Sequence, residues 1–300
     1  MQESSLADLI ASWVFYLDAE RKSPKTIEAY LRAATELDRF FADGRESQPV
    51  SELKRQVVER YLIATRQRTS ASTAATRYRA LKQFFRWLVD VEGELEKSPM
   101  QGLRMPKLDE RPVFVIPEDQ VAALFDVLKG RRDFASVRDR AILRVFLNTG
   151  IRVGEMVGLR LVEVELRRKR AVVKGKGNKT REVPLGPKAV LEIDRYLRAR
   201  RGHPLASEPW LWLGSRGRLT DSGVTQMLRR RCQEAGVPAV NPHRWRHTMS
   251  HYFLAAGGSE HDLAALHGWT STQMVQRYAK STAVDRAMAT HERISPGDHL

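Results

Sequence analysis

The first part of the chain alternates apolar and polar residues with the period of an α-helix. Between residues 5 and 18 the apolar side chains share one helical face, and Ser5 and Asp8 are placed as a capping box. Ser23, followed by Pro24, predicts the N-cap and first position of a second helix. The same period predicts two further helices, over residues 50–65 and 72–91.

A segment without a clean period follows these helices. Residues 98–117 contain four prolines, a glycine and mixed charges, which is typical of an exposed linker. A chain of 300 residues is long enough for two domains with full-sized cores. We therefore predict an N-terminal helical domain over residues 1–104, a linker over 105–112 and a second domain over 113–300.

The second domain opens with helical patterns over residues 117–128 and 136–150, and Gly150 is placed as a C-terminal cap. The pattern then becomes short, alternating and β-branched, which predicts a three-stranded antiparallel sheet. Its strands are residues 161–166, 170–173 and 180–185. From residue 186 the helical period returns, interrupted by the apolar "WLWL". The predicted fold class is mainly α with a small antiparallel β-sheet.

The net charge of the chain limits the classes of molecule that it is expected to bind. The formal net charge is +15 and the excess is spread along the chain, which favours a polyanion. Nucleic acid and an anionic membrane both meet that condition. The sequence has no run of 18 apolar residues and no signal-peptide pattern at its start, so we expect a soluble, intracellular protein and no membrane partner. The single cysteine, Cys232, excludes a disulfide framework and a multi-thiolate zinc site, and we expect it to be buried.

Two segments place basic residues beside glycines. Arg152 lies between Gly150 and Gly154, with Glu155 three residues on. Taken alone this is a surface ion pair, but flanking glycines favour close approach by a ligand. The other segment, "KGKGNKT", forms a hairpin tip that is not a nucleotide-binding loop, because no helix follows it. Its lysines either lie in a solvated turn or enter a DNA groove; they are Lys174, Lys176 and Lys179.

The stretch "NPHRWRHTMSHYF" places three histidines on one helical face, at 243, 247 and 251. A zinc site of the H-E-x-x-H type is disfavoured, because position 244 is arginine and a metal would face like charges. His247 and His251 fit a half-buried scaffold better. His243 lies in the first turn with Arg246 three residues on, and amide donors, imidazole and guanidinium together favour a phosphate site.

These segments, with a late tyrosine at 278, resemble the tyrosine recombinase family of phage integrases and Xer-type resolvases in order and spacing. The resemblance implies that Tyr278 attacks a DNA phosphodiester and forms a 3′-phosphotyrosyl bond with a free 5′-hydroxyl. Arg152 and Arg246 would bind the phosphate oxygens. Lys176 would protonate the leaving 5′ oxygen, with Lys174 and Lys179 as weaker candidates.

The resemblance also assigns the remaining site residues. His243 would accept the tyrosine's proton or donate to the phosphate, and Glu155 would buttress the site. The family commonly has a histidine nine residues before the tyrosine, where this chain has Trp269. Its indole N–H can donate to the phosphate, so Trp269 is preferred and His267 is the alternative.

The resemblance implies no metal and no ATP or other cofactor, since the phosphotyrosine stores the bond energy. It implies a two-domain clamp around double-stranded DNA that carries a specific recombination site. Residues 279–300 would dock on a neighbouring protomer, in a homo-tetramer or a hetero-tetramer with a paralogue. The expected location is the cytoplasm, at the nucleoid. The capped helix starting at Ser5 leaves no room for an arm-site domain, which favours simple sites.

Many exposed cations could contact the DNA backbone, and base-reading ones cannot be told from them by sequence. The candidates are Lys174, Lys179, Arg216, Arg218, Arg229, Arg230, Arg231 and Arg244.

Two other functions compete with recombination. A type IB topoisomerase uses the same chemistry, but the two-domain layout and trailing tail favour a recombinase. A catalytically silent DNA-binding protein is disfavoured by the intact set of site residues. The choice among chromosome-dimer resolution, phage integration and plasmid or transposon recombination stays open.

Overall fold

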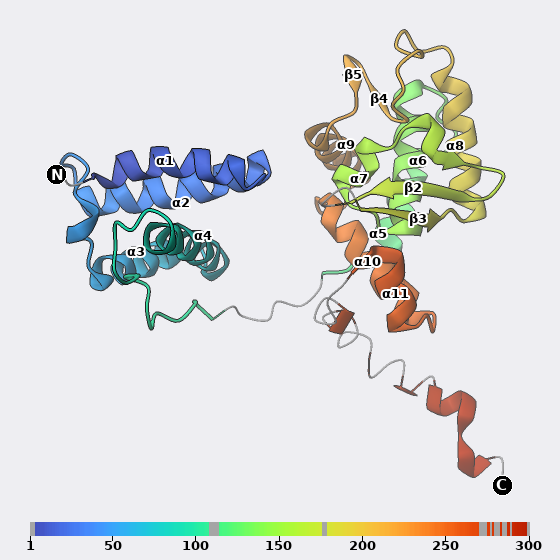
Figure 1. The fold of residues 1–300 in the computed structure, drawn as a ribbon. Coiled ribbons are helices and arrows are strands. Elements are labelled where there is room, and N and C mark those ends of the chain that lie inside the picture. Colours follow the sequence, from blue (N-terminus) through green and yellow to red (C-terminus); the bar gives the residue numbers. More distant parts are fainter. Residues whose placement is uncertain are drawn as a thin grey trace. The chain divides into compact units, whose positions relative to one another are not determined.

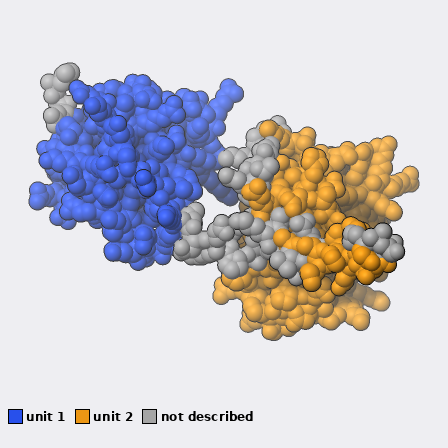
Figure 2. Space-filling view, turned by 90° about the horizontal axis from the view of Figure 1, so that it is seen from below, with its two compact units in different colours: residues 1–111 blue, residues 112–300 orange. Residues whose placement is uncertain are grey.

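A computed structural model of the chain shows two compact units, residues 1–111 and 112–300, which Figure 2 colours separately. Each unit has its own hydrophobic core. The residues that the structure describes are 4–107, 114–175, 179–269, 275, 276, 278, 283, 287, 288 and 290–298. The predicted fold class, mainly α with a small antiparallel sheet, is confirmed.

The first unit is helical (Figure 1). Helix α2 packs against both α1 and α4, and α3 packs on α4. Aromatic rings fill the space between them: the ring centroids of Trp13 and Phe84 lie 4.8 Å apart. The elements are α1 (Leu6–Ala19), α2 (Pro24–Ala42), the 3-10 turn η1 (Val50–Glu52), α3 (Arg55–Arg68) and α4 (Ala71–Asp90).

The predicted helix starts at Ser5 and Ser23 are confirmed. Each serine hydroxyl accepts a hydrogen bond from the backbone N–H three residues on, in Asp8 and Thr26. The helix predicted over residues 50–65 is wrong in its first turn. Leu53 and the N-cap Lys54 have extended backbones between η1 and α3, and the buried Leu53 side chain anchors this break.

The second unit combines helices with two small sheets (Figure 1). Its helices are α5 (Glu118–Asp126), α6 (Phe134–Thr149), α7 (Val153–Gly158), α8 (Pro187–Arg200), α9 (Asp221–Glu234), α10 (Pro242–Ala255) and α11 (Glu260–His267), with 3-10 turns η2 (Leu161–Glu163) and η4 (Pro296–Asp298). Its strands are β1 (Val164–Glu165), β2 (Arg170–Lys174), β3 (Thr180–Pro184), β4 (Leu213–Gly214) and β5 (Gly217–Arg218).

The predicted three-stranded antiparallel sheet is confirmed, in the order β1-β2-β3. Ala171 on β2 pairs with Val164 on β1 and with Val183 on β3. The first strand is shorter than predicted, because residues 161–163 form the turn η2. The end of "WLWL" pairs with residues 217–218 as a second hairpin that the sequence pattern did not predict.

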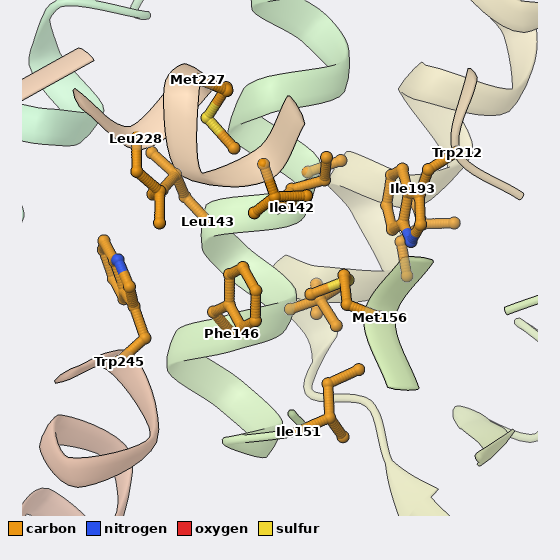
Figure 3. Packing of buried hydrophobic residues seen from close by; sticks show 14 of the residues in the cluster. Ile142, Leu143, Phe146, Ile151, Met156, Ile193, Trp212, Met227, Leu228 and Trp245 are labelled. Atoms are coloured by element: carbon orange, nitrogen blue, oxygen red, sulfur yellow. The ribbon is translucent and has the colours of Figure 1, made fainter. Parts of the chain in front are cut away.

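Helix α6 lies at the centre of the second unit. It packs against α8 and α10, and Figure 3 shows Leu143 and Phe146 facing Leu228 on α9 and Trp245 on α10 in one hydrophobic cluster. The helix ends at Gly150, whose left-handed backbone (φ 58°) confirms the predicted cap. The chain turns at Gly150 and reaches Arg152 two residues later. Helix α6, which is packed in the core, therefore determines where Arg152 lies.

Two smaller expectations also concern this unit and the chain as a whole. Cys232 is buried, as predicted, and burial raises the pKa of its thiol. Among the described residues, no helix is long and apolar enough to span a membrane.

Candidate active site

The turn after α6 positions Arg152 at the N-cap of α7. Its backbone N–H donates to Oε2 of Glu155 at 2.8 Å, and its Nη1 donates to Oε1 at 2.9 Å. The ion pair expected from the spacing is therefore present. The Arg152 side chain is still 46% exposed, whereas that of Glu155 is 2% exposed. The buried Glu155 carboxylate therefore holds the Arg152 guanidinium at the surface.

Glu155 has a second arginine partner that sequence analysis missed. Arg181 on β3 donates to both Glu155 oxygens, at 2.8 and 2.9 Å, and its Nε donates to the carbonyl oxygen of Leu266 at 2.9 Å. Burial alone would raise the pKa of the Glu155 carboxyl, but hydrogen bonds from Arg181 and Arg152 hold that pKa below its usual range. The Glu155 carboxylate thus connects Arg152 to Arg181 on β3, and Arg181 in turn contacts the end of α11.

Arg246 on α10 is 2% exposed and is held by backbone carbonyls. Its Nη1 donates to the carbonyl oxygen of Gly150 at 2.8 Å, and its Nη2 donates to that of His267 at 3.1 Å. Burial, followed by the charge of Arg152, lowers the pKa of Arg246 to about 9. At neutral pH the guanidinium is charged, and a nearby anion would stabilise it.

Tyr278 is fully buried, in a small cluster with Met249, Leu254 and Leu263. Its ring stacks on Trp269, with centroids 5.2 Å apart and planes at 14°. The Trp269 ring also lies 5.1 Å from the Arg246 guanidinium carbon. Among the described residues the indole N–H of Trp269 has no hydrogen-bond partner. The structure therefore brings together the predicted nucleophile, one predicted arginine and a donor with unused capacity.

The histidine helix begins as expected, with His243 in its first turn, but His247 has a contact that sequence analysis did not predict. Asn241 caps α10, and His243 is exposed in the first turn. His247, which the sequence assigned to the scaffold, is 7% exposed, and its Nδ1 lies 2.6 Å from the Tyr278 hydroxyl oxygen. The rings of His243 and His247 lie 4.2 Å apart. The described residues include no group of three or more His, Cys, Asp or Glu side chains that could hold a metal ion.

His267, the alternative to Trp269, is fully buried. Its Nε2 lies 3.3 Å from Sδ of Met249, and its ring occupies the space that a side chain at Gly150 would need. Burial, followed by the charge of Arg246, lowers the pKa of His267 to about 2. The Trp269 ring stacks on Tyr278 and lies 4.5 Å from the His267 ring, centroid to centroid.

The predicted lysines divide into described and undescribed residues. Lys176, the candidate proton donor, lies outside the described residues. Nζ of Lys174 pairs with Oε1 of Glu163 at 2.8 Å, and Lys179 is exposed beside β3.

The candidate DNA-contacting arginines differ in exposure. Arg216, Arg218 and Arg229 are exposed, while Arg230 is half exposed and donates to Asp139. Arg218 also lies over the Trp210 ring, 4.4 Å from its centroid. Arg244 is partly buried over Phe114.

Arg231 is a correction to the set of DNA-contacting candidates. It is 3% exposed, and its guanidinium donates to Asp139 and Glu234. These carboxylates occupy the positions that a phosphate would need, so Arg231 is not available to DNA. The burial was readable in the sequence, because Val224, Met227 and Leu228 place position 231 on the apolar face of α9.

Comparison with known proteins defines the class. The phage integrase family model matches residues 115–284, and the model of the phage integrase N-terminal SAM-like domain matches residues 10–92. The chain therefore belongs to the phage integrase family, as the resemblance predicted. It is a tyrosine-type site-specific recombinase, an enzyme that breaks and rejoins DNA strands.

Relatives of the chain include proteins of the Xer type. Tyrosine recombinase XerC of Pelobacter propionicus is 30% identical over 295 residues, which cover 97% of this chain and 96% of that protein. The solved Tn1549 transposon integrase in complex with transposon right end DNA has a TM-score of 0.76 at 18% identity, covering 97% of this chain and 100% of that one. A lambda integrase tetramer bound to a Holliday junction has a TM-score of 0.72 at 15% identity, covering 92% and 78%. Both solved structures have the same fold as this chain.

Proposed function

We propose that Tyr278 is the nucleophile of this recombinase and forms a 3′-phosphotyrosyl bond with the cleaved DNA strand. The observation that carries the proposal is the stacking of Tyr278 on Trp269, next to the buried Arg246. A tyrosine hydroxyl, an indole N–H with no described partner and a guanidinium held by carbonyls meet at one place. Together they fit an attack on a phosphodiester.

Arg152 and Arg246 neutralise the charge that develops on the nonbridging oxygens during this attack. Arg246 approaches from the buried side, and the half-exposed Arg152 approaches from the surface. Glu155 and Arg181 fix Arg152 before the DNA arrives, so little reorganisation is needed at the transition state. Trp269 donates its N–H to the same phosphate.

Two protons must move in the reaction. Lys176 gives a proton to the leaving 5′ oxygen, and His243 either accepts the tyrosine's proton or donates to the phosphate. The reverse transfers allow a 5′-hydroxyl from another strand to attack the phosphotyrosine and rejoin the DNA. No metal or cofactor takes part in this sequence of steps.

The domain layout and assembly are part of the same proposal. Residues 1–104 bind DNA, residues 105–112 link, and residues 113–300 catalyse, so that the two domains clamp one duplex. Strand exchange between two duplexes uses a tetramer, of this chain alone or with a paralogue, with the tail after Tyr278 docked on a neighbour. The lambda integrase tetramer on a Holliday junction, which shares the fold, supports the tetrameric part of this proposal. Its DNA substrate places the enzyme in the cytoplasm, at the nucleoid.

Trapping the covalent intermediate tests the proposal. The substrate is a duplex that carries a binding site selected from random sequences with the protein itself. A nick close to the cleavage position lets the cleaved fragment diffuse away, so the covalent complex accumulates. Wild type is expected to give a covalent protein–DNA band, and Tyr278→Phe none. An equal band from Tyr278→Phe would refute the assignment.

The same assay tests the absence of a metal from the mechanism. EDTA is expected to leave the covalent band unchanged, because arginines and the indole N–H supply the positive charge and donors. Loss of the band in EDTA, with recovery on adding zinc, would support a metal site on the histidine helix instead.

A further inference from the structure

A buried histidine that sequence analysis assigned to the scaffold contacts the hydroxyl of the proposed nucleophile directly. Nδ1 of His247 lies 2.6 Å from the Tyr278 hydroxyl oxygen, and the two rings are 5.3 Å apart. Both side chains are buried, at 7% and 0% exposure. This is the distance of a short hydrogen bond, in a place where water does not compete for it.

The direction of this hydrogen bond depends on the tautomer of His247. In the tautomer that carries its proton on Nε2, His247 presents an unprotonated Nδ1, and the tyrosine hydroxyl donates to it. A neutral imidazole in this position is a base within direct reach of the proton that must leave. His243, the residue assigned by resemblance, is exposed one helical turn away and contacts the His247 ring.

We propose that His247 is a further catalytic residue, which accepts the proton of Tyr278 as the hydroxyl oxygen attacks the phosphate. The inference rests on the proposed function, because it takes Tyr278 as the nucleophile. It divides the two roles left open for His243: His247 handles the proton, and His243, in the exposed first turn of α10, donates to the phosphate.

The step balances within the site. The O–H bond of Tyr278 breaks as its oxygen forms the O–P bond, and the proton passes to Nδ1 of His247, which becomes an imidazolium. The bond from phosphorus to the 5′ oxygen breaks, and Lys176 supplies the proton to that oxygen. When a 5′-hydroxyl attacks in the rejoining step, His247 returns its proton to the departing tyrosine oxygen. The imidazolium thus stores the proton for the lifetime of the covalent intermediate.

Substitutions of His247 separate proton transfer from positioning. His247→Gln keeps a polar group beside the hydroxyl but cannot take up a proton, and His247→Phe keeps only the ring volume. Both are expected to slow covalent-complex formation by about 10²- to 10⁴-fold, the usual contribution of a general base. His251→Phe is the matched control, one turn further along α10 and half-buried, and is expected to cleave like wild type. Duplex binding and thermal unfolding of each variant show that the loss is not one of folding.

A modified substrate identifies which proton is affected. When sulfur replaces the bridging 5′ oxygen, the leaving thiolate needs no proton. The defect of Lys176→Ala should then largely disappear, while the defect of His247→Phe should persist, because nucleophile activation is unchanged. Recovery of His247→Phe on the sulfur substrate would overturn the inference by placing His247 on the leaving-group side.

The outcomes distinguish the inference from the function on which it rests. If His247→Gln cleaves at the wild-type rate while Tyr278→Phe gives no covalent band, Tyr278 is the nucleophile and His247 only positions it, so the inference fails alone. If Tyr278→Phe still forms the covalent band, the proposed function fails whatever the His247 variants do.

Discussion

Two arginines of the second unit are almost equally buried, yet their surroundings are opposite. Arg231 is 3% exposed and Arg246 is 2% exposed. Burial alone would lower the pKa of Arg231, but hydrogen bonds to Asp139 and Glu234 raise it above its ordinary value. The pKa of Arg246 is lowered, to about 9, by burial and by the charge of Arg152. The difference lies in the partners and not in the depth.

Around Arg231, each arginine donates to a carboxylate. Asp139 is fully buried and accepts hydrogen bonds from Arg138, Arg230 and Arg231. Around Arg246, the described hydrogen bonds go only to the carbonyl oxygens of Gly150 and His267, which hold the group without neutralising it. The first cluster is complete in the sense that each of its arginines has a carboxylate partner within the folded chain. The second is incomplete: Glu155 lies nearby, but among the described residues Arg246 donates to no carboxylate, and a DNA phosphate would supply that partner.

Removing the acid of the complete cluster should have the largest effect on stability. Asp139→Asn leaves three arginines without their shared counter-charge, so the free energy of unfolding should fall by about 3–5 kcal/mol. Urea unfolding measures this. Glu234→Gln is the control, and because the Glu234 side chain is 30% exposed it should lose less than about 1 kcal/mol. Equal losses would mean that Asp139 is not the centre of the cluster.

The corresponding change in the incomplete cluster should affect catalysis more than folding. Arg246→Lys gives up part of the donor set, and covalent-complex formation should slow by on the order of 100- to 1000-fold. The free energy of unfolding should fall by only about 1–3 kcal/mol, because no carboxylate loses its partner. Single-turnover cleavage and urea unfolding on the same preparation test both parts. Wild-type cleavage, or instability equal to that of Asp139→Asn, would contradict the contrast.

A smaller loss is expected when a neutral donor of the site is removed. Trp269→Phe keeps a ring to stack on Tyr278 but removes the indole N–H, at a cost of about 1.5–3 kcal/mol if that group donates to a charged phosphate. Cleavage should therefore slow by roughly ten- to a hundredfold. Trp210→Phe, beneath Arg160 and Arg218, is the matched control. Cleavage by Trp269→Phe at the control's rate would exclude the indole from phosphate binding.

The last prediction concerns how the contribution of Glu155 to stability changes with pH. Its pKa is lowered in the folded state, so its contribution to stability is complete above the ordinary glutamate range and is lost as the pH falls through the lowered value. The difference in urea midpoint between wild type and Glu155→Gln should be widest near neutral pH and should shrink on acidification. A difference that grows at low pH would reverse the assigned sign.

Short-range signals explain what the sequence predicted well. Ser23 with Pro24, and Gly150, define helix ends through contacts within one turn, and the structure has these ends where they were expected. The alternating segments likewise indicated the three-stranded antiparallel sheet that the structure contains. The recombinase class followed from several residue types that occur in the same order as in the family. No single segment was specific enough to indicate the class.

The residues that sequence analysis missed depend on partners far along the chain. Arg181 looks like an ordinary polar position of a strand, and its partner Glu155 lies 26 residues away. His247 shares its helical face with His243 and His251, and only the Tyr278 hydroxyl, 31 residues later, distinguishes it. Local periodicity places such side chains on a face but does not say what covers that face.

The stacking of Trp269 on Tyr278 also gives the enzyme an internal optical reporter. The indole contacts the tyrosine ring, the His267 ring and the Arg246 guanidinium, so its fluorescence senses whether the tyrosine is in place. When Tyr278 leaves the stack to join the DNA, the emission of Trp269 is expected to change without any added dye. With Trp269→Phe to subtract the background of the other five tryptophans, movement of the nucleophile becomes measurable in real time.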